Sequence, residues 1–308
     1  MENENTNTPI EIVINSGSGA DDKTDVVEQL KELFAERNIP VKFSLIEGGD
    51  DFTKILERIP HGESKTIVAA GGDGTINAVA SALIKTDKTL GVLPLGTLNH
   101  FSKDLQIPQD LAEAVRVIAE NYTTEIDVGE VNGEIFINNS SLGLYPRIVR
   151  KREVQQERLG RGKWFAAFWA ALSIFRRYPF LDIKLKIEGK QLERRTPFVF
   201  VGNNEYEIDS FNIGGRASLQ DGILSIYVLH RTGRLGLLLL AVRSLFGILR
   251  EAEDFDEFFT DEFTIEKRRT KKSTLVALDG EVKLMESPIR YRILPKVLRV
   301  IVPKVEDK

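Results

Sequence analysis

The sequence contains no cysteine and no long hydrophobic run, and these two absences narrow the classes of protein it can belong to. Without cysteine there is no disulfide, no thiolate nucleophile and no thiolate-bound zinc, which fits a reducing compartment. The longest apolar stretches, residues 164–175 and 235–242, fall short of the roughly 20 residues that a membrane-spanning helix needs. Residues 1–9 are polar and lack the apolar core of a signal peptide, so we expect a cytoplasmic protein.

An excess of charge is also lacking. The formal net charge is −4 over 308 residues, which gives no global reason to expect binding to nucleic acid. Apolar residues make up 42% and charged residues 29% of the chain, as in ordinary globular proteins. A chain of this length can bury one large core or two moderate ones.

Strand and helix patterns alternate along residues 1–124. Buried-strand patterns occur at residues 10–14, 41–45, 67–70 and 90–93. Apolar residues at helical spacing follow them at residues 26–34, 52–59, 76–84 and 111–118. This βαβα order predicts an α/β domain in which helices cover a parallel sheet. Ligands of such sheets bind beyond the carboxyl ends of the strands.

The pattern changes after residue 124 and predicts a mainly β second domain over residues 125–289. Asn132-Gly133 is a strong signal for a hairpin turn. Further strand patterns occur at residues 181–187, 198–201, 224–229, 263–265, 275–278 and 290–302. Periodicity leaves open whether residues 290–308 return to complete the first domain.

A glycine-rich turn, Gly-Gly-Asp-Gly-Thr at residues 71–75, lies between a strand pattern and a helix pattern. Glycines let the backbone approach a phosphate closely, and the free N–H groups of a helix's first turn point at it. Asp73 puts a carboxylate where phosphates would arrive, which makes sense if a divalent cation, a ribose or a water lies between them. Alone, this turn is also compatible with a purely structural role.

Two more polar turns follow strand patterns, at residues 94–101 (Pro-Leu-Gly-Thr-Leu-Asn-His-Phe) and 15–19 (Asn-Ser-Gly-Ser-Gly). Thr97 and Asn99 are suited to hydrogen-bond a phosphate or a ribose. Each turn alone is compatible with a plain helix start. Because the three turns would meet at one edge of a parallel sheet, together they predict a single nucleotide ligand.

Two acidic turns lie downstream. Asp279-Gly280-Glu281 follows a strand pattern, and on its own Asp-Gly is a hairpin turn. Asp221-Gly222 is compatible with a turn or with a cation ligand beside backbone carbonyl groups.

Residues 71–77, 94–101, 220–224 and 279–281, in this order and spacing, resemble the diacylglycerol kinase catalytic-domain family, which includes bacterial lipid kinases, sphingosine kinases and ceramide kinases. The resemblance extends from about residue 10 to residue 303. It implies a nucleotide-binding α/β domain like that of NAD kinases, followed by a β-sandwich, with ATP and substrate in the cleft between them.

The resemblance also implies roles for individual residues. Glu281 is expected to accept the proton of a lipid hydroxyl, and Asp73 joins it as a catalytic group. Mg²⁺ is expected at Asp221 with groups at Ser218 and Ile223. The expected nucleotide-binding residues, from the three turns and from the strand before the second helix, are Asn15, Ser44, Gly71, Gly72, Asp73, Gly74, Thr75, Ile76, Asn77, Gly96, Thr97 and Asn99. Leu45 is the alternative to Ser44.

The sequence departs from the family pattern at three positions. Ser16, Ala78 and His100 stand where proline, glutamate and aspartate are common. Two carboxylates of the family pattern are therefore missing, while the loop backbones remain in place.

Two aromatic or apolar stretches with basic neighbours, residues 164–175 and 235–249, suit a membrane interface, where the bases meet anionic head groups. Core helices with solvated basic flanks, or walls of an acyl-chain pocket, are the alternatives. We therefore expect peripheral contact with the inner face of the membrane; a homodimer is left open.

The sequence thus predicts an ATP-dependent lipid kinase of phospholipid metabolism. The alternatives are a kinase of a soluble alcohol or of NAD, and a non-catalytic regulator that binds nucleotide or lipid.

Overall fold

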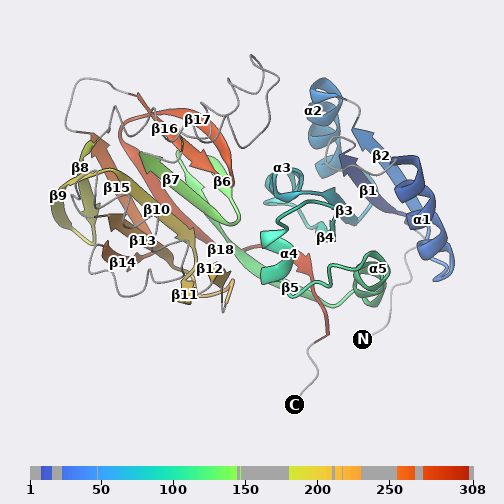
Figure 1. The fold of residues 1–308 in the computed structure, drawn as a ribbon. Coiled ribbons are helices and arrows are strands. Elements are labelled where there is room, and N and C mark those ends of the chain that lie inside the picture. The colour runs from blue at the N-terminus through green and yellow to red at the C-terminus, as the bar shows by residue number, and fades with distance from the viewer. Residues whose placement is uncertain are drawn as a thin grey trace, which may run out of the picture. The chain divides into compact units, whose positions relative to one another are not determined.

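The computed structural model describes residues 8–15, 23–46, 48–143, 146, 180–209, 212–216, 218–229, 255–267 and 273–304 (Figure 1). The chain divides into two compact units. The first comprises Met1–Ile126 and Lys296–Lys308, and the second comprises Asp127–Pro295.

The first unit is built on a parallel sheet in the order β2-β1-β3-β4, extended by the C-terminal end of β18. Its strands are β1 (Ile10–Asn15), β2 (Val41–Ile46), β3 (Thr66–Gly71), β4 (Thr89–Pro94) and the end of β18 (Ile289–Ile301). The strands β3 and β4 are buried along almost their whole length, as expected for a parallel sheet covered on both faces.

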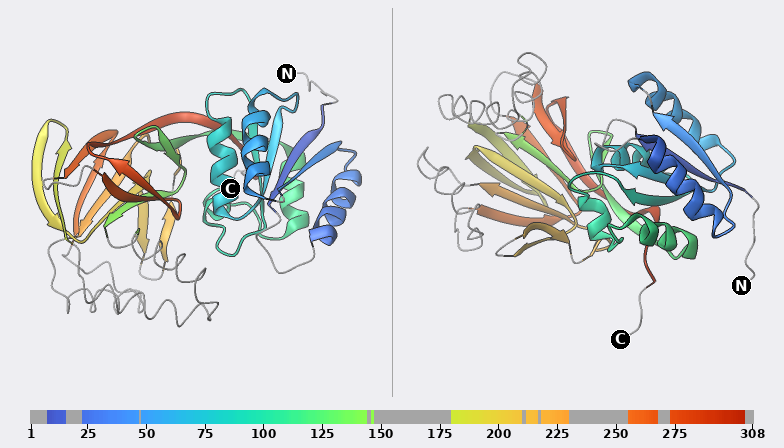
Figure 2. Two further views of the ribbon diagram at one scale, coloured as in Figure 1. Left: turned by 90° about the horizontal axis from the view of Figure 1, so that it is seen from above. Right: turned by 45° about the vertical axis from the view of Figure 1, so that its right-hand side comes forward.

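Helices flank this sheet: α1 (Lys23–Ala35), α2 (Gly49–Arg58), α3 (Asp73–Leu83), α4 (His100–Asp104) and α5 (Leu111–Glu120), with a short 3₁₀ turn at Ile59–His61. The contacts pair α2 with α3 and α1 with α5, and Figure 2 shows these pairs on opposite faces of the strands. In α3 the buried positions Ile76, Val79, Ala80 and Leu83 recur at helical spacing and pack the helix on β3.

The second unit is a β-sandwich (Figure 2). One layer contains β5 (Thr123–Val131), β6 (Glu134–Phe136), β8 (Leu181–Ile187), β9 (Lys190–Thr196), β15 (Glu262–Lys267) and most of β18. The other has the order β14-β13-β10-β7-β16-β17, with β7 (Asn139–Gly143), β10 (Phe198–Asn203), β13 (Leu224–Leu229), β14 (Phe255–Thr260), β16 (Ser273–Leu278) and β17 (Glu281–Glu286). A separate hairpin consists of β11 (Tyr206–Asp209) and β12 (Asn212–Arg216).

The core of the sandwich lies between its two layers. Tyr291 of β18 is fully enclosed, stacks on Phe263 with ring centroids 4.7 Å apart, and hydrogen-bonds Ser140 of the opposite layer at 2.9 Å. Inward-facing residues alternate along β8, where Leu181, Ile183 and Leu185 are buried. The alternation explains why these strands are visible in the sequence.

The predicted fold class, an α/β unit followed by a mainly β unit, is confirmed. The predicted hairpin at Asn132-Gly133 is also confirmed, because β5 and β6 pair around it and both turn residues have positive φ, 48° and 90°. The sequence analysis missed β7, β9, β11, β12, β14 and β17. Residues 164–175 and 235–249, for which membrane contact is expected, lie outside the described residues. Among the helices that the structure describes, none is long and apolar enough to cross a membrane.

Candidate functional site

The first glycine turn joins β3 to α3 and is open at its tip. A Cβ on Gly71 would lie 2.9 Å from the Thr75 side chain, so the turn requires glycine there. Gly72 precedes the helix and has no side chain to cap it, which leaves the first amides of α3 for another acceptor. A Cβ on Gly74 would meet nothing within 4 Å. The turn therefore presents backbone N–H groups to open space, as a phosphate site needs.

The second glycine turn lies directly beside the first. The strands β3 and β4 are parallel neighbours, and the Leu95 N–H donates to the Gly71 carbonyl at 3.2 Å. A Cβ on Gly96 would lie 2.5 Å from the Cα of Gly72, so the two turns touch backbone to backbone. Thr97, which is exposed, follows this contact. The structure thus brings together the two turns that the sequence analysis assigned to one ligand.

The carboxylate of Asp73 links the two turns. It accepts the backbone N–H of His100 at 3.3 Å and of Phe101 at 3.2 Å, the first residues of α4. A carboxylate at a helix N-terminus is favoured both by hydrogen bonding and by the helix dipole. Asp73 therefore holds the second turn on the first, and its catalytic role and its contact with nucleotide stay predictions.

Asn15 brings the end of a third strand to the same place. Its side-chain amide donates to the Thr75 hydroxyl at 2.9 Å, across from the first turn of α3. The rest of the turn at residues 15–19 lies outside the described residues. Asn15 and Thr75 thus place the end of β1 next to the first glycine turn.

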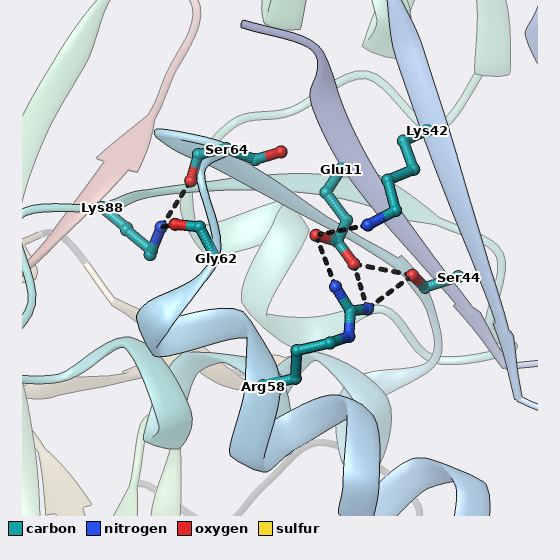
Figure 3. Close-up of polar contacts among 7 residues, drawn as sticks. All are labelled: Glu11, Lys42, Ser44, Arg58, Gly62, Ser64 and Lys88. Atoms are coloured by element: carbon teal, nitrogen blue, oxygen red, sulfur yellow. Dashed lines mark hydrogen bonds and ion pairs between the residues drawn. The ribbon is translucent and has the colours of Figure 1, made fainter.

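Ser44 is engaged in a different cluster (Figure 3). Its buried hydroxyl donates to Glu11 at 2.6 Å and accepts from Arg58 of α2 at 2.9 Å. Burial acts to raise the pKa of Glu11, but the hydrogen bonds from Arg58 and Ser44 outweigh it and leave the pKa below its usual value. The Ser44 hydroxyl is therefore committed to an internal ion pair, and its nucleotide contact stays a prediction; the alternative, Leu45, is 45% exposed.

A second polar contact in Figure 3 lies at the N-terminal end of β3, whereas the glycine turns lie at its C-terminal end. Lys88 is buried and donates to the carbonyl groups of Gly62 and Ser64, each at 2.6 Å. Because this contact precedes β3 and the glycine turns follow it, Lys88 has a structural role away from the candidate site.

Two buried side-chain oxygens near the turns have no hydrogen-bond partner among the described residues: Oδ1 of Asn77 and Oδ1 of Asn99. The Asn99 amide nitrogen, by contrast, donates to Gln109 at 3.1 Å, and its backbone has a left-handed φ of 52°. A buried acceptor without a donor is costly, so these oxygens fit a ligand that carries N–H or O–H groups, such as adenine or ribose. With the open amides, they make ATP a chemical fit to this site.

In the second unit, Glu281 follows a tight turn. Asp279 and Gly280 have φ values of 45° and 91°, and Leu278 pairs with Glu281 across the turn, which closes the β16–β17 hairpin. Glu281 is exposed. The hairpin therefore presents an accessible carboxylate at a rigid position.

Asp279 anchors this hairpin to the chain segment before β7. Its carboxylate accepts the N–H groups of Ile137, Asn138 and Asn139 at 2.8–2.9 Å. Burial raises the pKa of Asp279 to about 6, although these amides and the charge of Arg216 act to lower it. The sequence analysis assigned Asp279 only to the turn. No local signal shows its contact with residues about 140 positions away.

The expected metal turn contains one exposed carboxylate, Asp221. The carbonyl oxygen of Ile223 accepts the Asn204 N–H at 3.0 Å, and the Ser218 hydroxyl accepts the Gln220 N–H at 3.1 Å. Within the described ranges there is no group of three or more His, Cys, Asp or Glu side chains that could hold a metal ion. One carboxylate with backbone carbonyl groups and waters is nevertheless a ligand set that Mg²⁺ accepts, so the residues fit.

Two family models match the chain. The model described as the diacylglycerol kinase catalytic domain matches residues 9–131. The model described as the YegS C-terminal NAD kinase beta sandwich-like domain matches residues 147–302. The chain belongs to the diacylglycerol kinase catalytic-domain family. The resemblance drawn from the motifs is thus confirmed.

Proteins similar to this chain carry names that belong to the same family. A diacylglycerol kinase of Staphylococcus aureus (strain JH9) is 26% identical over 184 residues, which cover 59% of this chain and 58% of that protein. A Bacillus anthracis structure provisionally described as a diacylglycerol kinase is 25% identical, with a TM-score of 0.73 over 96% of this chain and 97% of its own. A second structure from that organism, 20% identical with a TM-score of 0.70, shows the shared fold alone.

Proposed function

We propose that the protein is an ATP-dependent lipid kinase, which transfers the γ-phosphoryl group of ATP to the hydroxyl of a diacylglycerol-like lipid. The observation that carries the proposal is the contact between Gly72 and Gly96, which aligns two glycine turns at the carboxyl ends of neighbouring strands. Membership of the diacylglycerol kinase family gives this nucleotide site its expected reaction.

The turns would hold the triphosphate. The amides at the start of α3 have no capping side chain, and the space beside Gly74 is open, so these amides would donate to phosphate oxygens. The unpaired oxygens of Asn77 and Asn99 would accept hydrogen bonds from the adenosine part. Thr97, exposed beside Gly96, would add a hydroxyl.

Mg²⁺ would be held by Asp221 with groups at Ser218 and Ile223. When bound, the ion supplies positive charge that offsets the negative charge of the phosphates. Asp221 is exposed and its own N–H is tied to the Asn204 side chain at 3.1 Å, so the backbone of the turn is fixed while the carboxylate stays accessible.

Glu281 would act as the general base. Its carboxylate takes the proton of the lipid hydroxyl as the oxygen bonds to the γ-phosphorus, and the bond from that phosphorus to the β,γ-bridging oxygen breaks, so that ADP leaves. Glu281 is exposed on the β16–β17 hairpin, so a lipid hydroxyl could reach its carboxylate.

A lipid acceptor requires access to a membrane surface. The aromatic and basic residues 147–177 supply the side chains that suit anionic head groups. We include in the proposal peripheral contact with the inner face of the membrane through this segment. Liposome sedimentation of the variant with Trp164 and Trp169 changed to serine tests it: reduced binding supports the contact, and unchanged binding refutes it.

The function itself is tested with γ-labelled ATP and a panel of acceptors: diacylglycerol, a sphingoid base, phosphatidylglycerol, glycerol and NAD. Label in a lipid supports the proposal. Label only in glycerol or NAD identifies a kinase of soluble acceptors, and ATP binding with no labelled product identifies a regulator.

A further inference from the structure

Arg216 is a buried cation in the second unit that the proposed reaction does not use. It ends β12, is 7% exposed, and lies over the ring of Tyr206 with 5.5 Å between the guanidinium carbon and the ring centroid. A buried arginine needs hydrogen-bond acceptors for its donors, because an unpaired buried charge is strongly destabilising. Its acceptors therefore show what it holds in place.

Two of the acceptors, in Ile137 and Asn138, belong to the segment between β6 and β7, and a third, in Asn203, ends β10. One guanidinium nitrogen donates to the carbonyl oxygens of Ile137 at 2.7 Å and Asn203 at 3.1 Å. The other donates to Oδ1 of Asn138 at 2.9 Å. Two nitrogens of one rigid group thus fix both the backbone and a side chain of residues 137–138.

The carboxylate of Asp279 binds the same segment, but through the backbone N–H groups of the segment rather than through its carbonyl groups. Its carboxylate accepts the N–H groups of Ile137, Asn138 and Asn139, while Arg216 binds the Ile137 carbonyl and the Asn138 side chain. The Asp279 N–H also donates to the Asn139 carbonyl at 2.9 Å. A cation and an anion therefore engage residues 137–139 together, and Glu281 follows the anion by two residues.

We propose that Arg216 is a positioning residue for Glu281, acting through residues 137–139 and Asp279. The proposal rests on the proposed function, because the position of Glu281 matters most if Glu281 is the base. Without the guanidinium group, the Ile137 carbonyl loses one of its donors and the Asn138 side chain loses a charge-assisted bond. The segment then loosens, and with it the anchor of the hairpin.

Two substitutions separate the hydrogen-bonding fork of Arg216 from its charge. Arg216→Met removes both, whereas Arg216→Lys keeps the charge but lacks the planar fork whose two nitrogens bind the Ile137 carbonyl and the Asn138 side chain. The matched control is Arg194→Met, because Arg194 also pairs with a carboxylate in the sandwich, Asp256 at 2.6 Å, without contact to residues 137–139 or 279–281.

The first readout is hydrogen–deuterium exchange, followed by mass spectrometry, in peptides that contain residues 137–139 and 279–281. It needs no substrate, so it tests Arg216 even if the protein phosphorylates no lipid. We expect faster exchange in Arg216→Met, a smaller increase in Arg216→Lys and none in Arg194→Met. Equal exchange in Arg216→Met and Arg194→Met would overturn the proposal. If Arg216→Met fails to fold, Arg216→Lys compared with Arg194→Met decides in the same way.

The second readout is steady-state kinetics with the lipid that the acceptor panel identifies. A misplaced base lowers kcat by ~10²-fold but leaves the KM for ATP unchanged, since the glycine turns are not altered. We expect this split in Arg216→Met, with partial recovery in Arg216→Lys. Unchanged kcat, or a loss of kcat no larger than that of Arg194→Met, would show that Arg216 only stabilises the fold.

Discussion

The backbone of Gly96 approaches that of Gly72 so closely that a Cβ on Gly96 would lie 2.5 Å from the Gly72 Cα and 2.7 Å from Oδ1 of Asn99. Neither neighbour can move freely, since Gly72 immediately precedes α3 and Asn99 immediately precedes α4. The spacing of the two turns therefore depends on the absence of a side chain at position 96.

Gly96→Ala should push the two turns apart. Overpacking of this kind costs about 1–3 kcal/mol, and here the displaced atoms include the amides proposed to bind phosphate. We expect ATP affinity, measured by isothermal titration calorimetry, to fall at least tenfold, the equivalent of about 1.4 kcal/mol. Gly49→Ala is the control, because a Cβ there meets nothing within 4 Å. Normal ATP affinity in Gly96→Ala would contradict the packing argument.

Asp73→Ala should remove the cap that ties α4 to the first turn. Loss of such a cap costs about 0.5–2 kcal/mol of unfolding free energy, and we expect weaker ATP binding together with a lower thermal midpoint. Asp73→Asn keeps one acceptor and should fall between Asp73→Ala and the unmodified protein. If Asp73→Ala lost turnover while keeping both its midpoint and its ATP affinity, Asp73 would act on metal or phosphate rather than on the turn.

The raised pKa of Asp279 makes the free energy of unfolding depend on pH. Its pKa is about 6 in the folded protein against a usual value of 3.8, so the folded state holds the proton more tightly. This contribution to stability is complete below about pH 4 and is lost as pH rises through about 6. In Asp279→Asn that loss should disappear, although the amide binds fewer N–H groups. Urea unfolding at pH 4 to 7 measures the difference; parallel curves for the two proteins would contradict it.

Asp221→Asn should raise the Mg²⁺ concentration needed for half-maximal activity, by roughly tenfold or more, the scale of a weakened metal site. Excess Mg²⁺ should then restore most of the turnover, because the amide still offers one oxygen. A titration of activity against free Mg²⁺ measures this shift. If Asp221→Asn responded to Mg²⁺ as the unmodified protein does, the turn at residues 218–223 would not be the metal site.

The sequence predicted the turns whose conformation is set by a few neighbouring residues. The Asn132-Gly133 hairpin depends on positive φ values that few residues adopt, and the turn at residues 71–75 depends on a close approach that excludes a side chain at Gly71, so both were visible in the sequence. The strands β7 and β9 were not: Asn139–Gly143 is buried but rich in serine, and Lys190–Thr196 is mostly polar. Their pairing comes from neighbours in the sheet, which override propensity.

The polar contacts of the candidate site were the least predictable part. Glu11 lies in what the sequence presents as a buried strand, and its charge is stabilised by Arg58, 47 residues away. The carboxylate of Asp73 accepts the N–H groups of His100 and Phe101, a contact that the sequence analysis did not predict. Such contacts join segments that are far apart in the sequence, and the periodicity of apolar residues does not predict them.

Glu281 is proposed to accept the proton of the lipid hydroxyl. The most direct test measures ATP affinity by calorimetry and lipid phosphorylation by label transfer in Glu281→Gln, which keeps the shape of the side chain. If Glu281 is the base, ATP affinity should be unchanged and turnover should fall by ~10²–10⁴-fold, the usual contribution of a general base. Turnover close to that of the unmodified protein, or equal losses of turnover and ATP binding, would contradict it.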